Sequence, residues 1–299
     1  MPFYKFMHRD LAAETKYLLK QYNMSAGRTA GQNFLIDDKV LQDIIAAADI
    51  QPSDFVLEVG AGLGILTTQL AKRAKRVLAV EYDERCFPAL QKLSSLHDNL
   101  IIIHDDILRL ANKELARHLS GDDYRVIANI PYQITAKLIY KFIQDVPPAQ
   151  DLVLLVQQEV AERITAEPGQ MSLLALSVQF YAQVEIIRQV DKHCFWPVPA
   201  VDSALIHIIR QPQKMIERER RNIDEKRLWQ ILRSGFSSKR KTLANNLANS
   251  LHLTRTEIEE NLNRVGLSKN CRAQELSLQQ WLDLVDILPA GQAYPAGRI

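Results

Sequence analysis

The chain has 299 residues, more than one small hydrophobic core fills, and this length suits two domains. Hydrophobic residues make up 47% of it and charged residues 24%, which excludes wholesale disorder, collagen-like repeats and a disulfide scaffold. The three cysteines lie far apart, so we predict no zinc spacing, no disulfide framework and no bound metal. No apolar run approaches the roughly 18 residues of a membrane helix, and the first residues do not resemble a signal peptide. We therefore expect a reduced, cytoplasmic protein that does not enter a membrane.

Charge is unevenly distributed along the chain, although the net charge is only +2. Residues 212–299 contain 15 Lys and Arg against 10 Asp and Glu, whereas the remainder contains 22 against 25. An acidic body with a basic end is typical of proteins that bind nucleic acid. Solvated helix faces that are basic without a functional reason remain the alternative.

Elements alternate regularly through the first two hundred residues. Residues 1–26 are interpreted as an extension with one amphipathic helix over 11–22, and a helical spacing begins again at residue 40. The predicted strands that follow are 55–60, 76–81, 99–106, 124–131 and 151–158, and the predicted helices between them are 66–74, 86–93, 110–119 and 134–143. Short apolar strands that alternate with amphipathic helices indicate a doubly wound, Rossmann-like α/β domain with a parallel sheet.

The pattern changes after about residue 167. Residues 174–190 are predicted as a helix that runs into a strand, and 203–211 as a last strand, so that an antiparallel pair closes the sheet. Helical patterns follow over 214–232, 239–251, 254–265 and 278–288, the third opened by a capping box of Thr254 and Glu257. We therefore predict an α/β domain over 27–211, a small all-helical domain over 212–288, and a flexible tail over 289–299.

A glycine turn joins the first predicted strand to its helix. A dinucleotide fingerprint needs G-x-G-x-x-G, but Ile65 stands where the third glycine belongs, which argues against a nicotinamide dehydrogenase. The observed pattern is Glu58, Gly60, Gly62 and Gly64, a turn whose missing side chains let a ligand approach the backbone. Because a carboxylate beside a pyrophosphate is repulsive, Glu58 favours a cationic ligand such as S-adenosylmethionine.

Acidic residues end the next two predicted strands. Glu81 lies 21 residues beyond Gly60 and can accept both hydroxyls of a ribose. Asp105 and Asp106 end the third strand, where an acceptor can bind the exocyclic amine of an adenine. Because ligand crevices in open sheets lie at the carboxyl ends of the strands, these acids together predict a cofactor site.

The fourth predicted strand ends in Asn129, Ile130, Pro131 and Tyr132. An amine conjugated with an adenine ring is a poor nucleophile, and two acceptors that hold its N–H groups can free its lone pair. The side-chain oxygen of Asn129 and the carbonyl before Pro131 can supply them, the proline stiffens the turn, and Tyr132 can stack on a flipped base. This segment is therefore the predicted substrate site.

Several motifs together carry a family resemblance. They are GQNFLID (31–37), EVGAGLG (58–64), the strand end Glu81, NIPY (129–132), VQQEVAERI (156–164), FWPVPAVDSAL (195–205), FSSKRKTLANNL (236–247) and RAQELS (272–277). With these motifs, which span roughly residues 30–288, the sequence resembles the KsgA/RsmA family of small-subunit (16S) ribosomal RNA adenine dimethyltransferases.

The resemblance implies transfer of methyl groups from S-adenosylmethionine to the N6 amines of two adjacent adenosines near the 3′ end of small-subunit ribosomal RNA. It implies that Asn33, Leu35, Gly60, Glu81, Asp106 and Asn129 line the cofactor, that Asn129 and Tyr132 face the target base, and that Phe195 covers that base from its other side. The expected partners are that RNA and the immature small ribosomal subunit, with the enzyme acting as a monomer.

Basic residues near the start of one predicted helix suit an RNA backbone. Arg233, Lys239, Arg240 and Lys241 accompany Leu243, Leu247 and Leu251, whose spacing predicts an inward-facing apolar stripe. Phosphate contacts from this set would position RNA without reading its sequence.

Two alternatives remain at this point. One is a related adenine methylase that acts on large-subunit (23S) RNA or on DNA, and the KRK and RAQELS segments argue against it. The other is an assembly factor that binds RNA without turnover, against which the intact acids and NIPY argue.

Overall fold

The computed structural model describes residues 10–24, 32–121, 123–211 and 224–288. The chain divides into two compact units. The first contains the residues up to 161 together with 182–210, and the second contains 162–181 together with the residues from 211 onward. The predicted flexible tail, 289–299, lies outside the described residues.

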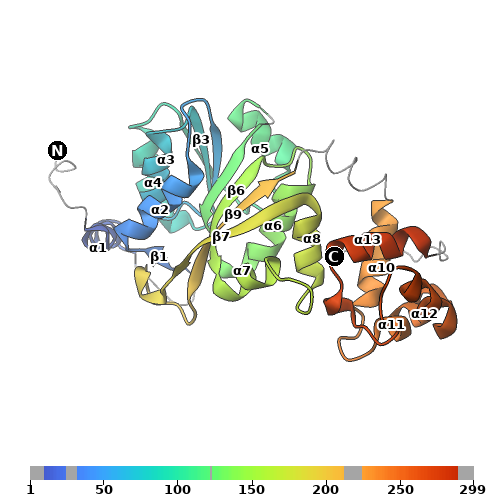
Figure 1. Ribbon diagram of the computed structural model, residues 1–299. Helices are drawn as coiled ribbons and strands as arrows, with labels where there is room; N and C mark the ends of the chain where they lie inside the picture. The colour runs from blue at the N-terminus through green and yellow to red at the C-terminus, as the bar shows by residue number, and fades with distance from the viewer. Residues whose placement is uncertain (1–9, 25–31, 122, 212–223, 289–299) are drawn as a thin grey trace. The chain divides into compact units, whose positions relative to one another are not determined.

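Within the described residues, the first unit is built on a seven-stranded sheet of order β4-β3-β2-β5-β6-β9-β7 (Figure 1). The strands are β2 (Phe55–Val59), β3 (Arg76–Glu81), β4 (Leu100–His104), β5 (Arg125–Asn129), β6 (Asp151–Gln157), β7 (Ala182–Val190) and β9 (Ser203–Arg210). The first five in the sheet are parallel, and β9 lies antiparallel between β6 and β7. The predicted parallel sheet with its antiparallel close is confirmed.

Helices cover both faces of this sheet, which explains why its central strands are apolar on both sides. Figure 1 shows α2 (Asp38–Ala48), α3 (Ile65–Ala71) and α4 (Phe87–Ser94) on one face, and α5 (Asn112–Leu119) and α6 (Thr135–Gln144) on the other. Short 3₁₀ turns, η2 (Glu84–Cys86) and η3 (Tyr132–Ile134), precede α4 and α6. The doubly wound arrangement predicted from the alternating pattern is therefore present.

A second, two-stranded sheet joins segments that are far apart in the chain. In it β1 (Phe34–Leu35) pairs antiparallel with β8 (Phe195–Trp196), with Phe34 opposite Trp196 and Leu35 opposite Phe195. The 3₁₀ turn η4 (Lys192–Cys194) precedes β8, and its Cys194 carbonyl accepts the Ile36 N–H at 2.8 Å. Strands of two residues have no periodicity, so this pairing could not be predicted from the sequence.

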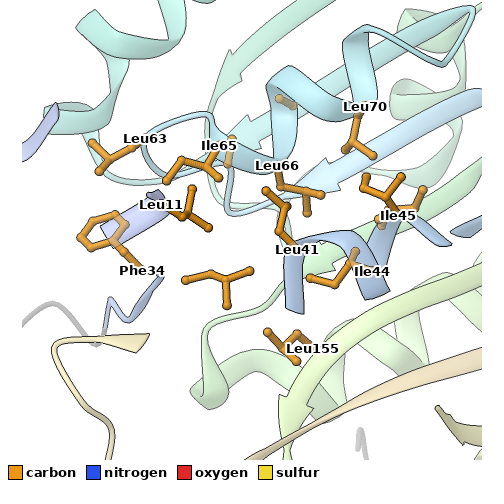
Figure 2. Close-up of a cluster of buried hydrophobic side chains, with 14 of the residues drawn as sticks. Leu11, Phe34, Leu41, Ile44, Ile45, Leu63, Ile65, Leu66, Leu70 and Leu155 are labelled. Carbon is orange, nitrogen blue, oxygen red and sulfur yellow. The ribbon is translucent and has the colours of Figure 1, made fainter. Parts of the chain in front are cut away.

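The N-terminal helix α1 (Leu11–Gln21) belongs to the core of the first unit. Its first turn is capped by Asp10, whose side chain accepts the Ala13 N–H at 3.0 Å. Leu11 is buried, and Figure 2 shows it pointing into the same apolar cluster as Phe34, Leu63 and Ile65. The helix predicted over 11–22 is confirmed, and its apolar face packs against the part of the unit that contains the glycine turn.

The described part of the second unit is all-helical. Its helices are α8 (Leu173–Tyr181), α10 (Glu225–Gly235), α11 (Leu243–Leu251), α12 (Arg255–Arg264) and α13 (Leu278–Ile287), with a 3₁₀ turn η5 (Ala273–Glu275); α7 (Gln158–Ile164) spans the boundary between the units. The predicted capping box is confirmed, because Thr254 accepts the Glu257 N–H at 3.2 Å and its own N–H donates to Glu257 at 2.7 Å. Trp281 is fully buried and its ring stacks 5.7 Å from Phe236.

The two compact units divide the chain differently from the predicted domains in two segments. Helix α1, predicted as part of a separate extension, belongs to the first unit, and residues 162–181 group with the helical unit. The rings of Phe180 and Tyr181 lie 5.6 and 6.3 Å from Trp229, and the Tyr181 hydroxyl donates to Glu225 at 2.7 Å. These aromatic contacts join segments some fifty residues apart, and their partners cannot be read from chain order.

Candidate active site

The carboxyl ends of β2, β3 and β5 converge because β2 pairs in parallel with β3 on one side and with β5 on the other. A pocket opens there, which we call the strand-end pocket. Its lining comes from the start of the β1 segment, the glycine turn and the end of β5, and consists of Gln32, Asn33, Phe34, Leu35, Leu41, Ile44, Glu58, Gly60, Ala61, Gly62, Leu63, Ile65, Leu66, Glu81, Asn129, Ile130, Pro131 and Tyr132.

Most of the predicted site residues meet in this pocket. Those that line it are Asn33, Leu35, Glu58, Gly60, Gly62, Glu81, Asn129, Pro131 and Tyr132. The other lining residues, which were not predicted from the sequence, are mainly apolar, such as Phe34, Leu63 and Ile65. Phe34 stood inside the QNFL motif, but nothing in an apolar residue's identity distinguishes a pocket wall from a core position.

The glycine turn has a backbone that only glycine adopts readily. Gly60 has φ +74° and Gly62 has φ +55°, both in the left-handed region. A Cβ on Gly60 would lie 3.4 Å from Pro131 Cδ, and one on Gly62 would lie 3.4 Å from the Phe34 ring. The turn thus lies within van der Waals range of Pro131 and Phe34, which also line the strand-end pocket.

Glu81 fixes this turn to the end of β3. It is 5% exposed, its Oε2 accepts the Gly62 N–H at 2.7 Å, and its Oε1 accepts the Asp83 N–H at 2.8 Å. Burial raises the pKa of Glu81, against these backbone hydrogen bonds. Since a carboxylate oxygen can accept more than one hydrogen bond, Glu81 retains capacity for two ligand hydroxyls.

Glu58 lies deeper, at 1% exposure, and its Oε2 has no hydrogen-bond partner among the described residues. Burial raises the pKa of Glu58 to about 8, and the nearby Glu81 carboxylate adds to the shift. A positively charged ligand group beside this carboxyl group would favour its ionised form, so the unpartnered oxygen of Glu58 on the pocket wall suits a cationic ligand.

Asn129 ends β5 and Tyr132 begins η3, and both line the strand-end pocket. The Asn129 side-chain amide donates to the Asn33 carbonyl at 3.4 Å, a long hydrogen bond that uses the amide nitrogen and not the amide oxygen. Pro131 caps η3 with φ −57° and carries no N–H. Tyr132 is half-buried, its hydroxyl lies 2.8 Å from Ser203 Oγ, and burial raises its pKa, so the phenol is neutral near pH 7.

Two of the residues predicted to bind the cofactor or the target base do not line the strand-end pocket. Asp106 follows β4 at the edge of the sheet, where its Oδ1 accepts the Leu108 N–H at 3.0 Å and its Oδ2 lies 3.7 Å from Arg109. Phe195 is 1% exposed and packs in the core, whereas its neighbour Trp196 is 43% exposed with Lys16 Nζ 5.8 Å from its ring centroid. The roles given to Asp106 and Phe195 stay predictions.

Three of the four basic residues predicted to bind RNA lie in a turn and not on a helix. Arg233 is on α10, but α11 begins only at Leu243, so Lys239, Arg240 and Lys241 precede it, which corrects the predicted helix over 239–251. Asn246 is buried and donates to the carbonyls of Gly235 and Ser238 at 2.6 and 3.0 Å. These bonds shape the turn that presents the three basic side chains, which are exposed.

Among the described residues, no group of three or more His, Cys, Asp or Glu side chains is placed to hold a metal ion. None of the described helices is both long enough and apolar enough to span a bilayer.

The raised pKa of Glu58 predicts a pH-dependent stability. The folded protein keeps a proton on Glu58 that the unfolded chain releases near pH 4.5, so this group's stabilisation is complete below pH 4.5 and is lost as pH rises to about 8. Glu58→Gln removes the titration. We measure the unfolding free energy of both proteins by urea titration. The value for Glu58→Gln minus the value for wild type should rise by about 2 kcal/mol from pH 6 to pH 9. An equal difference at both pH values would contradict a buried, protonated Glu58.

The sequence is similar to one family of known proteins over most of its length. The family model described as ribosomal RNA adenine dimethylase matches residues 24–289. "Ribosomal RNA small subunit methyltransferase A" of Bacillus cytotoxicus is 35% identical over 289 residues, covering 94% of this chain and 98% of that protein. The protein of the same name from Dehalococcoides mccartyi strain CBDB1 is 38% identical over 277 residues, covering 92% of each chain.

Two solved structures are also similar to this chain. A dimethyladenosine transferase from Plasmodium falciparum matches with a TM-score of 0.70 and 27% identity, covering 84% of this chain and 95% of that one. The 23S rRNA methyltransferase ErmE matches with a TM-score of 0.66 and 26% identity, covering 85% of this chain and 98% of that one. With a family model that spans most of its length and relatives above one third identity, the chain belongs to the ribosomal RNA adenine dimethylase family.

Proposed function

We propose that this rRNA adenine dimethyltransferase methylates the N6 amines of two adjacent adenosines near the 3′ end of small-subunit (16S) ribosomal RNA, with S-adenosylmethionine as donor. The observation that carries the proposal is the meeting of Glu81, the glycine turn and Asn129 in one strand-end pocket. It combines acceptors for a nucleoside cofactor with an acceptor for an aromatic amine. The names of the bacterial relatives support the small subunit as the source of the RNA.

Membership of this family implies S-adenosylmethionine, and the pocket residues fit that group. The unpartnered buried oxygen of Glu58 suits its positive charge, and the left-handed turn at Gly60 and Gly62 places backbone without side chains on the pocket wall. Glu81 would accept the ribose hydroxyls, Asn33 and Leu35 would close the pocket from the β1 side, and Asp106 would accept the adenine amine. When bound, this cofactor supplies an electrophilic methyl group on a sulfonium.

Asn129 would activate the target amine by accepting one of its N–H groups, while the Ile130 carbonyl accepts the other. This geometry turns the nitrogen lone pair out of conjugation with the ring without a strong base. Preorganised acceptors of this kind act most strongly where charge develops in the transition state. The Asn129 nitrogen is already engaged by the Asn33 carbonyl, which presents the amide oxygen for this purpose.

Two aromatic side chains would hold the target base. Tyr132 is placed at the pocket edge, and its ring would stack on one face of an adenine that has left the RNA stack. Phe195 would cover the other face, and its burial in the present structure means that it must turn outward to do so.

The helical unit would hold the RNA backbone through Arg233, Lys239, Arg240 and Lys241. All four are exposed, and none forms an ion pair within the described residues. We further propose that the substrate is the immature small subunit, that the enzyme works as a monomer in the cytoplasm, and that 27–211 and 212–288 serve as catalytic and RNA-binding domains, with 162–181 packed in the second unit.

A 23S rRNA adenine methylase, the class to which ErmE belongs by name, is the alternative, and it is not favoured. Its identity to this chain is 26%, against 35% and 38% for the small-subunit enzymes, so the small subunit remains the preferred substrate.

Mass spectrometry of ribosomal RNA tests the proposal. We expect small-subunit RNA from cells that lack this protein to carry two unmethylated adenosines, and purified enzyme with S-adenosylmethionine to dimethylate both. Asn129→Ala should lower the rate on the order of 100-fold with RNA affinity nearly unchanged, because it removes an interaction with the reacting amine. Dimethylation that persists without the protein, new methyl groups on large-subunit RNA, or an Asn129→Ala enzyme of normal rate would each contradict it.

Neutralising the basic turn should weaken RNA binding in a salt-dependent way. Replacing Lys239, Arg240 and Lys241 by Gln should reduce the slope of log affinity against log salt by about 2, since each phosphate contact contributes roughly 0.7 to 0.9. The charge-matched control replaces Lys226, Arg264 and Lys269, which are exposed in the same unit, and should leave the slope unchanged. Equal slopes for the two triple variants would place the RNA elsewhere.

A further inference from the structure

A buried serine lies beneath the aromatic residue proposed to stack on the target base. Ser203 is the first residue of β9, is 0% exposed, and is paired on both sides, opposite Gln157 of β6 and Val190 of β7. The pairing fixes its backbone from both sides. Its side-chain oxygen is therefore a rigid point near the pocket.

The backbone around Tyr132 is held by fewer hydrogen-bonded neighbours than the strand that contains Ser203. It begins the three-residue turn η3, which has no side-chain cap, and its carbonyl accepts the Thr135 hydroxyl at 3.2 Å. That contact fixes the backbone and not the ring. At the far end of the ring, the Tyr132 hydroxyl lies 2.8 Å from Ser203 Oγ, where either group can be the donor.

We propose that Ser203 is a positioning residue that sets the plane of the Tyr132 ring for stacking on the adenine. This inference rests on the proposed function and assigns a role to a residue that never touches the substrate. Burial shields the hydrogen bond from water on the serine side, so losing it would release the ring to other rotamers. Even a displacement of about 1 Å in a reactive complex can lower a rate markedly.

The same bond connects the two segments that would enclose the base. Ser203 ends the stretch that begins with Phe195, and the preceding Asp202 is held by its carbonyl, which accepts the Gln158 N–H at 3.0 Å, and by its side chain, which accepts the Lys192 N–H at 2.9 Å. Tyr132 and the last residue of this segment are thus joined by the hydroxyl pair of Tyr132 and Ser203.

The hydrogen bond between Tyr132 and Ser203 can be removed by a substitution at either residue. Ser203→Ala and Tyr132→Phe both remove it, and Tyr132→Phe keeps the stacking ring and removes only its hydroxyl group. We expect each to lower kcat about tenfold, and the double variant to be lowered about tenfold as well, because both changes delete one interaction. The dissociation constant for S-adenosylmethionine, measured by calorimetry, should stay within twofold of wild type.

Ser177→Ala is the matched control, since it removes a buried serine whose hydroxyl donates to the Leu173 carbonyl at 2.6 Å in the second unit. It should leave kcat unchanged. A normal kcat for Ser203→Ala or Tyr132→Phe, or a double variant lowered about 100-fold, would overturn the positioning role while the proposed function stands. Should Ser203→Ala fail to fold, Tyr132→Phe alone decides the question. If wild-type enzyme methylates no adenosine in small-subunit RNA, the proposed function falls and this inference with it.

Discussion

The site depends on the parallel register of β3, β2 and β5. In this register the last residue of β3, the turn after β2 and the last residue of β5 reach the same edge of the sheet. Glu81 then locks the turn by accepting the Gly62 N–H, and the Gly60 N–H is held by the Val80 carbonyl at 2.8 Å. Without this alignment, the cofactor acceptors and the amine acceptor would lie on unrelated parts of the surface.

The polar groups at this edge have different environments, and these suit different tasks. Glu58 is buried with an unpartnered oxygen, which favours a cationic ligand. Glu81 is buried but accepts two backbone N–H groups, so it is an ordered acceptor. Asn129 is uncharged and has its amide nitrogen engaged, which suits an amine that must be held and not deprotonated. One pocket can therefore hold a positively charged donor and a neutral nucleophile side by side.

Much of the fold could be predicted from sequence because its signals are local. The alternation of apolar strands with amphipathic helices gave the doubly wound sheet, and the spacing of Thr254 and Glu257 gave the start of α12. The glycine turn and the strand-end residues gave most of the pocket for the same reason, since parallel strands bring their ends together. Features that depend on distant partners could not be predicted. Phe180 and Tyr181 join the helical unit through Trp229, β1 pairs with β8 across some 160 residues, and Phe195 is buried although its motif indicates a base contact. The Ser203 contact with Tyr132 belongs to this group, because no pattern marks which buried serine meets which tyrosine.

The most direct test of the central claim is a crystal structure of the protein with S-adenosylmethionine. The account predicts that the ribose hydroxyls bind the Glu81 carboxylate, that the amino acid end lies over Gly60 and Gly62 near Glu58, and that the methyl group points toward Asn129 and Tyr132. A cofactor bound away from the ends of β2, β3 and β5, or with its methyl group directed away from Asn129, would contradict the account.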